Sequence, residues 1–335
     1  LVLGKPLEQI QEEALRNCGI ERVQVADGPV LVIGDHTWFT SALIRAFLNQ
    51  CSSDGGRLVV RGTFAEFTGP LQGLGDGDQI DLPVFFSPNG SKELDVLQGL
   101  PPVEVDLKVR VHQSPATHLA FKGVADQPIP VTDKMVHTID HWTHVHRVNL
   151  LALMAHAERQ RRQFVESWWW MKLWRFLCIL GKARSLHGAR IASALSQKGK
   201  GCKIHPTATV EASILGCGVE VGPYAVVQGS FLDDGAIIQE HAQVHLSVVG
   251  SSAVVGRGAM VRMSVLMERA MVSKSNGVQA SVIGRDAFVA VGATLYDLSF
   301  GGPIKVMHRG QRVSSGLRFL GACLGHRSKI GPHVR

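Results

Sequence analysis

The sequence predicts an α/β layer in the N-terminal part and an all-β parallel β-helix in the C-terminal part. Three observations support this: the length of 335 residues, an alternation of helical and strand-like segments before residue 131, and an apolar repeat that begins at Ile204. A chain of this length is expected to divide into more than one core. We expect an α/β domain over 1–131, a helical bridge over 132–200 and the β-helix over 201–335.

The repeat has a period of seventeen residues, divided as six, five and six. Each coil then supplies three short strands with one inward apolar anchor each, and coils bury these anchors by stacking on their neighbours. The pattern predicts a triangular parallel β-helix with 17-residue coils. The three anchor columns are Ile204, Val221, Ile238, Val255, Val272 and Val289; Val210, Val227, Val244, Val261, Val278 and Leu295; and Leu215, Leu232, Val249, Leu266, Ile283 and Phe300.

Two further columns follow the same period. Small residues fit beside tight corners, where a large side chain has no room, and they recur at Ala208, Ala225, Ala242, Ala259 and Ala293, with Asn276 as the exception. A column of serines occupies a position that either faces outward or forms a stacked ladder. Its members are Ser213, Ser230, Ser247, Ser264 and Ser281.

The period is interrupted after Phe300. It slips through Gly301-Gly302-Pro303 and resumes as Val313, Phe319, Leu324 and Ile330. This predicts a loop outside the coils near residues 308–315. An inserted loop in a repeat protein is a common place for function, although it can also be a plain surface excursion.

The phrase Ser281-Val282-Ile283-Gly284, with the related Ser247-Val248-Val249-Gly250, gives this region a family resemblance. It resembles the left-handed β-helix, hexapeptide-repeat superfamily, in particular the C-terminal domains of bacterial sugar-nucleotide pyrophosphorylases. The left hand of the coil and a homotrimeric assembly are implied by this resemblance.

The N-terminal segment alternates helical and strand-like stretches. Residues 7–18 read as an amphipathic helix ended by Gly19, residues 23–25 and 30–33 as buried strands, and residues 41–49 as a second helix. This alternation predicts an α/β layer with a mostly parallel sheet.

Two phrases in this segment resemble nucleotidyltransferases that make sugar nucleotides. They are Gly4-Lys5-Pro6-Leu7 with Cys18-Gly19-Ile20, and Val32-Ile33-Gly34-Asp35. The resemblance implies that Asp35 binds Mg²⁺ against phosphates, and that Gly4, Lys5 and Gly34 contact a nucleotide or sugar phosphate. A turn aspartate bonded to its own backbone is the alternative for Asp35. The family's Gly-rich phosphate loop does not precede Gly4, which predicts a truncated or degenerate transferase domain.

The bridge carries two candidate features. Thr132 and Asp133 are predicted to cap a helix that runs towards Arg162. Three histidines would lie in a stripe along this helix and form either a zinc site or a packing surface. They are His137, His141 and His144.

The second feature is the Trp-rich stretch within 168–182. It predicts an amphipathic helix that either lies in a membrane interface or packs on the β-helix or on another subunit. The stretch is too short to span a bilayer, and a short polar linker is expected at 196–201.

The charge and the cysteine content indicate which partners and which cellular location to expect. The net charge of +7 suits an anionic partner, but the basic residues do not follow a nucleic-acid-binding pattern, so we exclude nucleic acid. The six cysteines contain no CxxC pair, which favours a reducing cytoplasm. We therefore expect a cytoplasmic protein, with peripheral attachment at the inner membrane face as an option.

Three functions follow from these patterns, and a transferase is favoured. The first is a nucleotidyltransferase-like protein of sugar-nucleotide or cell-envelope precursor metabolism, possibly degenerate, that uses Mg²⁺. The second is a hexapeptide-repeat acyltransferase that takes acyl-CoA or an acyl-carrier thioester and uses His326 as general base, with His308 as the second candidate. The third is a non-catalytic, oligomeric scaffold apposed to a membrane.

Overall fold

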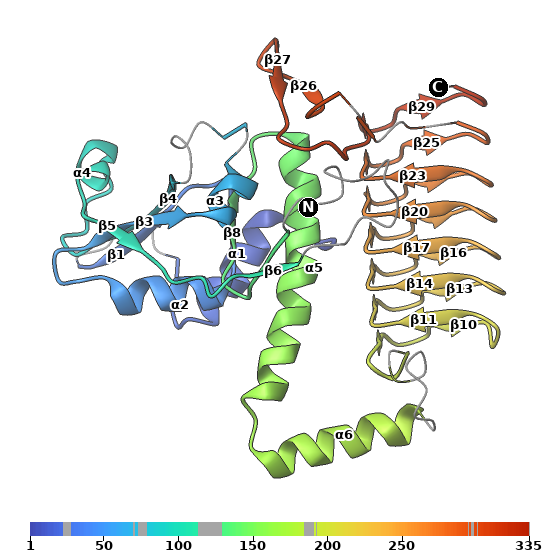
Figure 1. Cartoon of the computed structure of the whole chain (residues 1–335), viewed down its shortest axis with the longest axis horizontal. Coiled ribbons are helices and arrows are strands. Elements are labelled where there is room, and N and C mark those ends of the chain that lie inside the picture. Colours follow the sequence, from blue (N-terminus) through green and yellow to red (C-terminus); the bar gives the residue numbers. More distant parts are fainter. Residues whose placement is uncertain are drawn as a thin grey trace. The chain divides into compact units, whose positions relative to one another are not determined.

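The computed structural model describes residues 1–22, 28–69, 71–72, 79–112, 129–183, 191, 193–293, 295, 298–299 and 301–334 (Figure 1). The chain divides into two compact units. The β-helix unit consists of residues 1–4, 145–299 and 319–335, and the α/β unit of residues 5–144 and 300–318.

The β-helix unit is a parallel solenoid with three sheets, as the seventeen-residue period predicts. Ile204 pairs with Val221, and Val221 pairs with Ile238, so each strand bonds to the equivalent strand of the next coil. The first sheet contains β10 (Lys203–Ile204), β13 (Glu220–Val221), β16 (Ile237–Ile238), β19 (Val254–Val255), β22 (Met271–Val272), β25 (Phe288–Val289) and β29 (Lys329–Ile330).

The other two sheets have the same organisation. The second contains β11 (Thr209–Glu211), β14 (Val226–Gln228), β17 (Gln243–His245), β20 (Met260–Arg262) and β23 (Gly277–Gln279). The third contains β9 (Gln197–Lys198), β12 (Ile214–Leu215), β15 (Phe231–Leu232), β18 (Val248–Val249), β21 (Val265–Leu266), β24 (Val282–Ile283) and β28 (Cys323–Leu324). Because β9 pairs with β12, the predicted linker at 196–201 is already part of a coil.

The predicted anchors form the core of the solenoid. Val227, Leu232, Val244 and Val249 are fully buried, and so are Ala225, Ala242 and Ala259 of the alanine column, whereas Ala208 at its start is partly buried. Phe300 lies outside the described residues. Asn276, the exception in the alanine column, is also buried, and its Nδ2 donates to the carbonyl of Ala290 at 2.9 Å. The interior is therefore closed by regular apolar layers, each of which depends on the layers above and below it.

The serine column is buried and forms a ladder, which excludes the outward alternative. Ser247 Oγ donates to the carbonyl of His245 at 2.7 Å and accepts from the backbone N–H of Ser264 at 3.1 Å. The same pair of contacts recurs at Ser230 and Ser264. Each hydroxyl therefore satisfies a carbonyl of its own coil and a backbone N–H of the next coil.

The corners of the coils use left-handed backbone conformations. One column of positive φ runs through Ala212, Gly229, Leu246, Met263 and Ala280, seventeen residues apart. Left-handed conformation is unfavourable for residues with a Cβ, so the stacked hydrogen bonds on both sides must hold these corners in place.

The interruption after Phe300 forms a β-hairpin of the α/β unit. It consists of β26 (Lys305–His308) and β27 (Gln311–Ser314), so Val313 lies in the hairpin and its predicted place in a coil is wrong. The solenoid resumes in register, because β28 and β29 stack on β24 and β25. The backbone N–H of Ala322 bonds Ser281 Oγ, which continues the ladder over 41 residues instead of seventeen.

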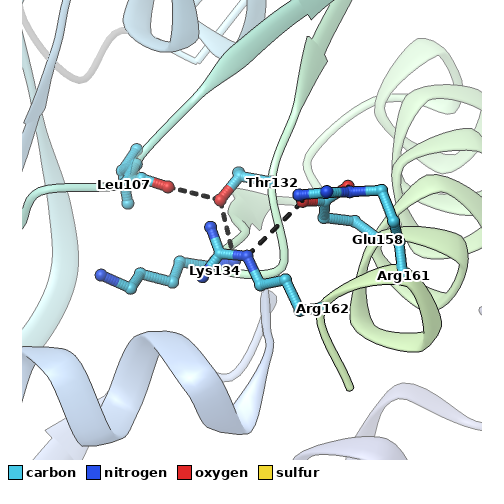
Figure 2. Close-up of polar contacts among 6 residues, drawn as sticks. All are labelled: Leu107, Thr132, Lys134, Glu158, Arg161 and Arg162. Atoms are coloured by element: carbon cyan, nitrogen blue, oxygen red, sulfur yellow. Dashed lines mark hydrogen bonds and ion pairs between the residues drawn. The ribbon is translucent and has the colours of Figure 1, made fainter. Parts of the chain in front are cut away.

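The helix predicted from Thr132 begins ten residues later, as α5 (Trp142–Val165). Thr132 caps no helix, because its hydroxyl donates to the carbonyl of Leu107 at 2.5 Å and accepts from the N–H of Lys134 at 3.2 Å (Figure 2). The residues that follow form β8 (Val136–Thr138), which pairs with β2 (Thr37–Phe39). Cross-strand bonding and β-branched residues thus override the helical spacing.

Later in α5, a buried carboxylate anchors two arginines. Glu158 accepts two hydrogen bonds from Arg161, at 2.8 and 2.9 Å, and one from Arg162 at 3.5 Å (Figure 2).

The Trp-rich stretch forms the predicted second helix, α6 (Trp169–Ala183). Among the described residues, no helix is both long and apolar enough to cross a membrane.

The α/β unit has a four-stranded sheet in the order β1-β4-β3-β5. Its strands are β1 (Val30–Ile33), β4 (Gln79–Ser87), β3 (Gly56–Arg61) and β5 (Pro102–Glu104). The prediction of an α/β region is confirmed, but the mostly parallel sheet is wrong: β1 and β3 both pair antiparallel with β4, and only β3 with β5 is parallel. A second strand pair joins β6 (Arg110–His112) to β7 (Ile129–Val131). The strand predicted at 23–25 lies outside the described residues.

Helices complete this unit. α1 (Leu7–Arg16) and α2 (Ser41–Gln50) match the predicted helices, while α3 (Thr63–Thr68) and α4 (Leu94–Gln98) are short. Leu43, Ile44 and Phe47 of α2 are fully buried, as the helical spacing of apolar residues requires. They provide the main helical contribution to the core of this unit.

Candidate functional site

The inserted hairpin presents a histidine next to its tight turn. Arg309 and Gly310 both have positive φ, the arrangement of a two-residue type I′ turn. His308 lies at the end of β26 beside this turn, and its side chain is half-buried. The hairpin therefore holds a titratable side chain on a short, well-paired element.

Successive ring contacts connect three further histidines of the α/β unit to His308. The ring centroids of His308 and His141 are 5.4 Å apart in a T-shaped arrangement, and those of His141 and His144 are 6.1 Å apart. His137 in β8 lies 5.0 Å from His144. The four histidines, His137, His141, His144 and His308, are called the histidine cluster below.

The predicted stripe of histidines along one helix is wrong, because the residues come from different elements. His137 belongs to a strand, His141 precedes α5, and His144 lies in the first turn of α5. His308 comes from the inserted hairpin, more than 160 residues further along the chain. Sequence reasoning identified each member but could not join them, because the fold, and not a helical period, creates the cluster.

Hydrogen bonds fix the proton positions of three of the rings. His141 Nε2 donates to the carbonyl of Met307 at 3.0 Å, while its Nδ1 accepts from the N–H of Thr143 at 3.3 Å. His144 Nδ1 accepts from the N–H of Asp140 at 3.1 Å. His137 Nδ1 donates to the carbonyl of Thr138 at 2.6 Å. Within the described part of the chain, the ring nitrogens of His308 have no hydrogen-bond partner.

The histidine cluster does not have the geometry of a metal centre. Among the described residues, no group of three or more His, Cys, Asp or Glu side chains could hold a metal ion. The contacts above explain this for His141, because a ring nitrogen that donates a proton to a carbonyl cannot also bind a metal. The zinc alternative therefore finds no support among the described residues, whereas the ring contacts fit the packing alternative.

The charge around His308 is positive. Lys305, Arg309 and Arg312 are exposed side chains of the hairpin. None of the three makes an ion pair with a described residue, and residues 301–318 contain no Asp or Glu. Such a cluster of unpaired cations favours an anionic ligand such as a phosphate group.

His326, the first candidate for general base, lies on the solenoid in the turn after β28. Its Nδ1 accepts from the backbone N–H of Arg285 at 2.9 Å. A neutral histidine with that contact carries its proton on Nε2, so the exposed nitrogen is a donor and cannot accept a proton there. The ring nitrogens of His308, in contrast, have no hydrogen-bond partner among the described residues.

The residues predicted to bind a nucleotide lie in two separate settings. Gly34 and Asp35 form the turn after β1, and Gln11 of α1 donates to the carbonyls of Asp35 at 3.2 Å and Thr37 at 2.7 Å. The Lys5 ammonium pairs with Glu13 at 2.7 Å. Asp35 is exposed. Mg²⁺ is usually bound by one or two carboxylates together with substrate phosphates. A single exposed carboxylate is compatible with such a site, but it does not identify one.

Gly4 has a structural role within the β-helix unit. Its φ is +77°, and a Cβ at this position would lie 2.3 Å from Asp233 Oδ2. The close approach and the left-handed backbone both explain why a glycine occurs here. These contacts account for Gly4 without a substrate.

No protein-family model matches the chain, and neither does any curated protein. Solved structures match little more than a third of the chain, with low TM-scores. A Bacillus cereus protein described as an acetyltransferase is 15% identical with a TM-score of 0.21, and the match covers 36% of this chain and 83% of that one. An Arabidopsis UDP-N-acetylglucosamine acyltransferase is 14% identical with a TM-score of 0.21, and the match covers 37% of this chain and 65% of that one.

Proposed function

We propose that the protein is an acyltransferase of the hexapeptide-repeat type in which His308 is the general base. The observation that supports this best is the state of His308: its ring nitrogens are uncommitted among the described residues, whereas hydrogen bonds occupy the other three rings of the histidine cluster. A general base needs a free nitrogen held in a fixed place.

In the proposed reaction, His308 accepts the proton of an acceptor hydroxyl or amine while that atom attacks the thioester carbonyl. The carbon–sulfur bond then breaks, and the thiolate leaves and takes the proton back from the imidazolium. Acyl-CoA and acyl-carrier thioesters both carry phosphates, which suit the unpaired Lys305, Arg309 and Arg312 of the hairpin. Mg²⁺ has no part in this reaction.

The test combines donor binding with turnover by the full chain. Acetyl-CoA should raise the melting temperature, and Arg309→Ala with Arg312→Ala should reduce that shift. Release of free CoA in the presence of candidate amine and hydroxyl acceptors should fall about 10²- to 10⁴-fold in His308→Ala, the range for loss of a general base.

His326→Ala is the matched control, since it removes the other candidate base. It should retain turnover. Loss of turnover in His326→Ala but not in His308→Ala would assign the base to the solenoid and contradict the proposal.

A second candidate function is nucleotidyl transfer in sugar-nucleotide or cell-envelope precursor metabolism. Gln11 supports it, because its two hydrogen bonds join the helix after Gly4-Lys5-Pro6 to the Gly34-Asp35 turn. The helix that follows Lys5 and Pro6 is thus bonded to the turn that holds Asp35.

Here a nucleoside triphosphate with Mg²⁺ should raise the melting temperature, and Asp35→Asn should remove the effect. Asp54→Asn, another exposed aspartate of the same unit, should not. If the melting temperature does not change with any nucleotide, this candidate function is wrong.

Two further features belong to the proposal. A homotrimer would follow from the resemblance of the solenoid, and sedimentation velocity measures it directly. The cytoplasmic setting follows from the cysteine pattern.

A further inference from the structure

The second helix of the β-helix unit exposes its tryptophans. Trp169 is 73% exposed, Trp174 67% and Trp170 56%, and Leu173 and Leu177 are each more than half exposed. Tryptophan normally contributes large buried area to cores and interfaces. Among the described side chains of α6, these five are therefore not covered by the β-helix, and they need another environment.

These residues form one continuous face of α6. At about 100° per residue, Trp169, Leu173, Leu177, Trp170 and Trp174 occupy an arc of about 140°. The basic positions Lys172, Arg175 and Lys182 fall on the remaining arc by the same spacing. By this spacing, the sequence of α6 separates an arc of aromatic and leucine positions from an arc that holds the basic positions.

The surrounding sequence has only one sign of charge. From Ser167 to Val210 there are eight Lys or Arg residues and no Asp or Glu. A second copy of this chain would bring the same positive segment against itself, which like-charge repulsion disfavours. An anionic surface complements both the aromatic face and the charge.

We propose that α6 lies in the interface of an anionic lipid bilayer and attaches the protein to it. Trp and Leu on one face with Lys and Arg on the other is the composition of helices that lie in the plane of the interface. Tryptophan favours this depth because its ring is apolar and its N–H finds hydrogen-bond acceptors near the headgroups. Fifteen residues extend about 22 Å, which is shorter than the roughly 30 Å bilayer core, so the helix lies along the surface.

The experiment uses the full chain and vesicles of phosphatidylcholine alone or with 30% phosphatidylglycerol. The protein should co-sediment with the anionic vesicles, and binding should weaken as salt is raised. Four of the six tryptophans lie within 168–174, so intrinsic fluorescence should shift to the blue and be quenched by brominated lipid.

Variants separate the two faces. Trp169→Glu with Trp174→Glu should lower vesicle partitioning at least 10-fold. Lys172→Glu with Arg175→Glu should lower it more than 10-fold on anionic vesicles, because each basic residue near such a surface contributes about fivefold. Leu94→Glu, at an equally exposed apolar position of α4, is the control and should bind as the unchanged protein does.

Two results would overturn the proposal. One is equal co-sedimentation of the Trp169→Glu, Trp174→Glu variant and the unchanged protein. The other is no vesicle binding by the unchanged protein together with dissociation of an oligomer by the same pair of substitutions, since that would assign the aromatic face to contact between copies. Neither result bears on acyl transfer, which is assayed with soluble donors.

Discussion

His146 should make the stability of the β-helix unit depend on pH. It lies in α5, is 4% exposed, and its Nε2 donates to the carbonyl of Met263 at 2.6 Å. Its Nδ1 has no hydrogen-bond partner among the described residues. Burial lowers the pKa of His146 from 6.5 to about 4, so the folded protein keeps this ring neutral.

The direction and size of the effect follow from that shift. Between pH 6.5 and about pH 4 the unfolded chain binds a proton that the folded chain does not, so protonation favours unfolding. The free energy of unfolding is therefore unaffected by protonation of His146 above pH 6.5, and it decreases as the pH falls from 6.5 to about 4. A shift of this size is worth about 3 kcal/mol near pH 4, at 1.36 kcal/mol for each pKa unit.

His146→Gln isolates this contribution, because the amide keeps a donor for the Met263 carbonyl and does not titrate. Urea unfolding at pH 7.5, 5.5 and 4, followed by circular dichroism, gives the free energy of unfolding for both proteins. The unchanged protein should lose about 3 kcal/mol more than the variant between neutral pH and pH 4. The same pH dependence in both proteins would show that His146 is not buried against Met263 as described.

Three other substitutions test the packing of the described structure by thermal or urea unfolding. Ser264→Ala removes a hydroxyl that both donates and accepts within the buried ladder and should cost about 1–3 kcal/mol, whereas Ser53→Ala on the surface should cost almost nothing. Glu158→Gln should destabilise by about 2 kcal/mol or more, because the buried carboxylate accepts bonds from two arginines. Leu232→Ala, at a fully buried position, should cost about 2–5 kcal/mol, with Leu94→Ala as the exposed control.

The solenoid could be predicted closely because its determinants are local and repeated. A β-branched or aliphatic residue every seventeen positions specifies both the strand and its register, and five serines at the same spacing specify a ladder. The direction of the serines could not be predicted, because a short polar side chain suits a surface as well as a buried hydrogen bond. The contacts of Ser247 with two backbone groups settle that question.

The rest of the fold depends on contacts between distant residues. Val136–Thr138 forms a strand because β2 is available as a partner, and Thr132 bonds Leu107 instead of capping a helix. The sheet of the α/β unit is mostly antiparallel because β4 lies between β1 and β3, an order that alternation along the sequence does not reveal. The spacing of His137, His141 and His144 was visible, but their approach to His308 required the fold.

The regular coils also explain why a reactive side chain would come from an insertion. Within each coil the inward positions carry the core, the serine column bonds backbone groups, and the corners need small or left-handed residues. At the corners many exposed side chains pair across neighbouring coils, as Arg269 does with Asp286. His326 is also bonded to a neighbouring coil, because its Nδ1 accepts from the backbone N–H of Arg285. An insertion that leaves the register intact escapes these constraints. His308 lies on such a segment, and its ring nitrogens have no hydrogen-bond partner among the described residues.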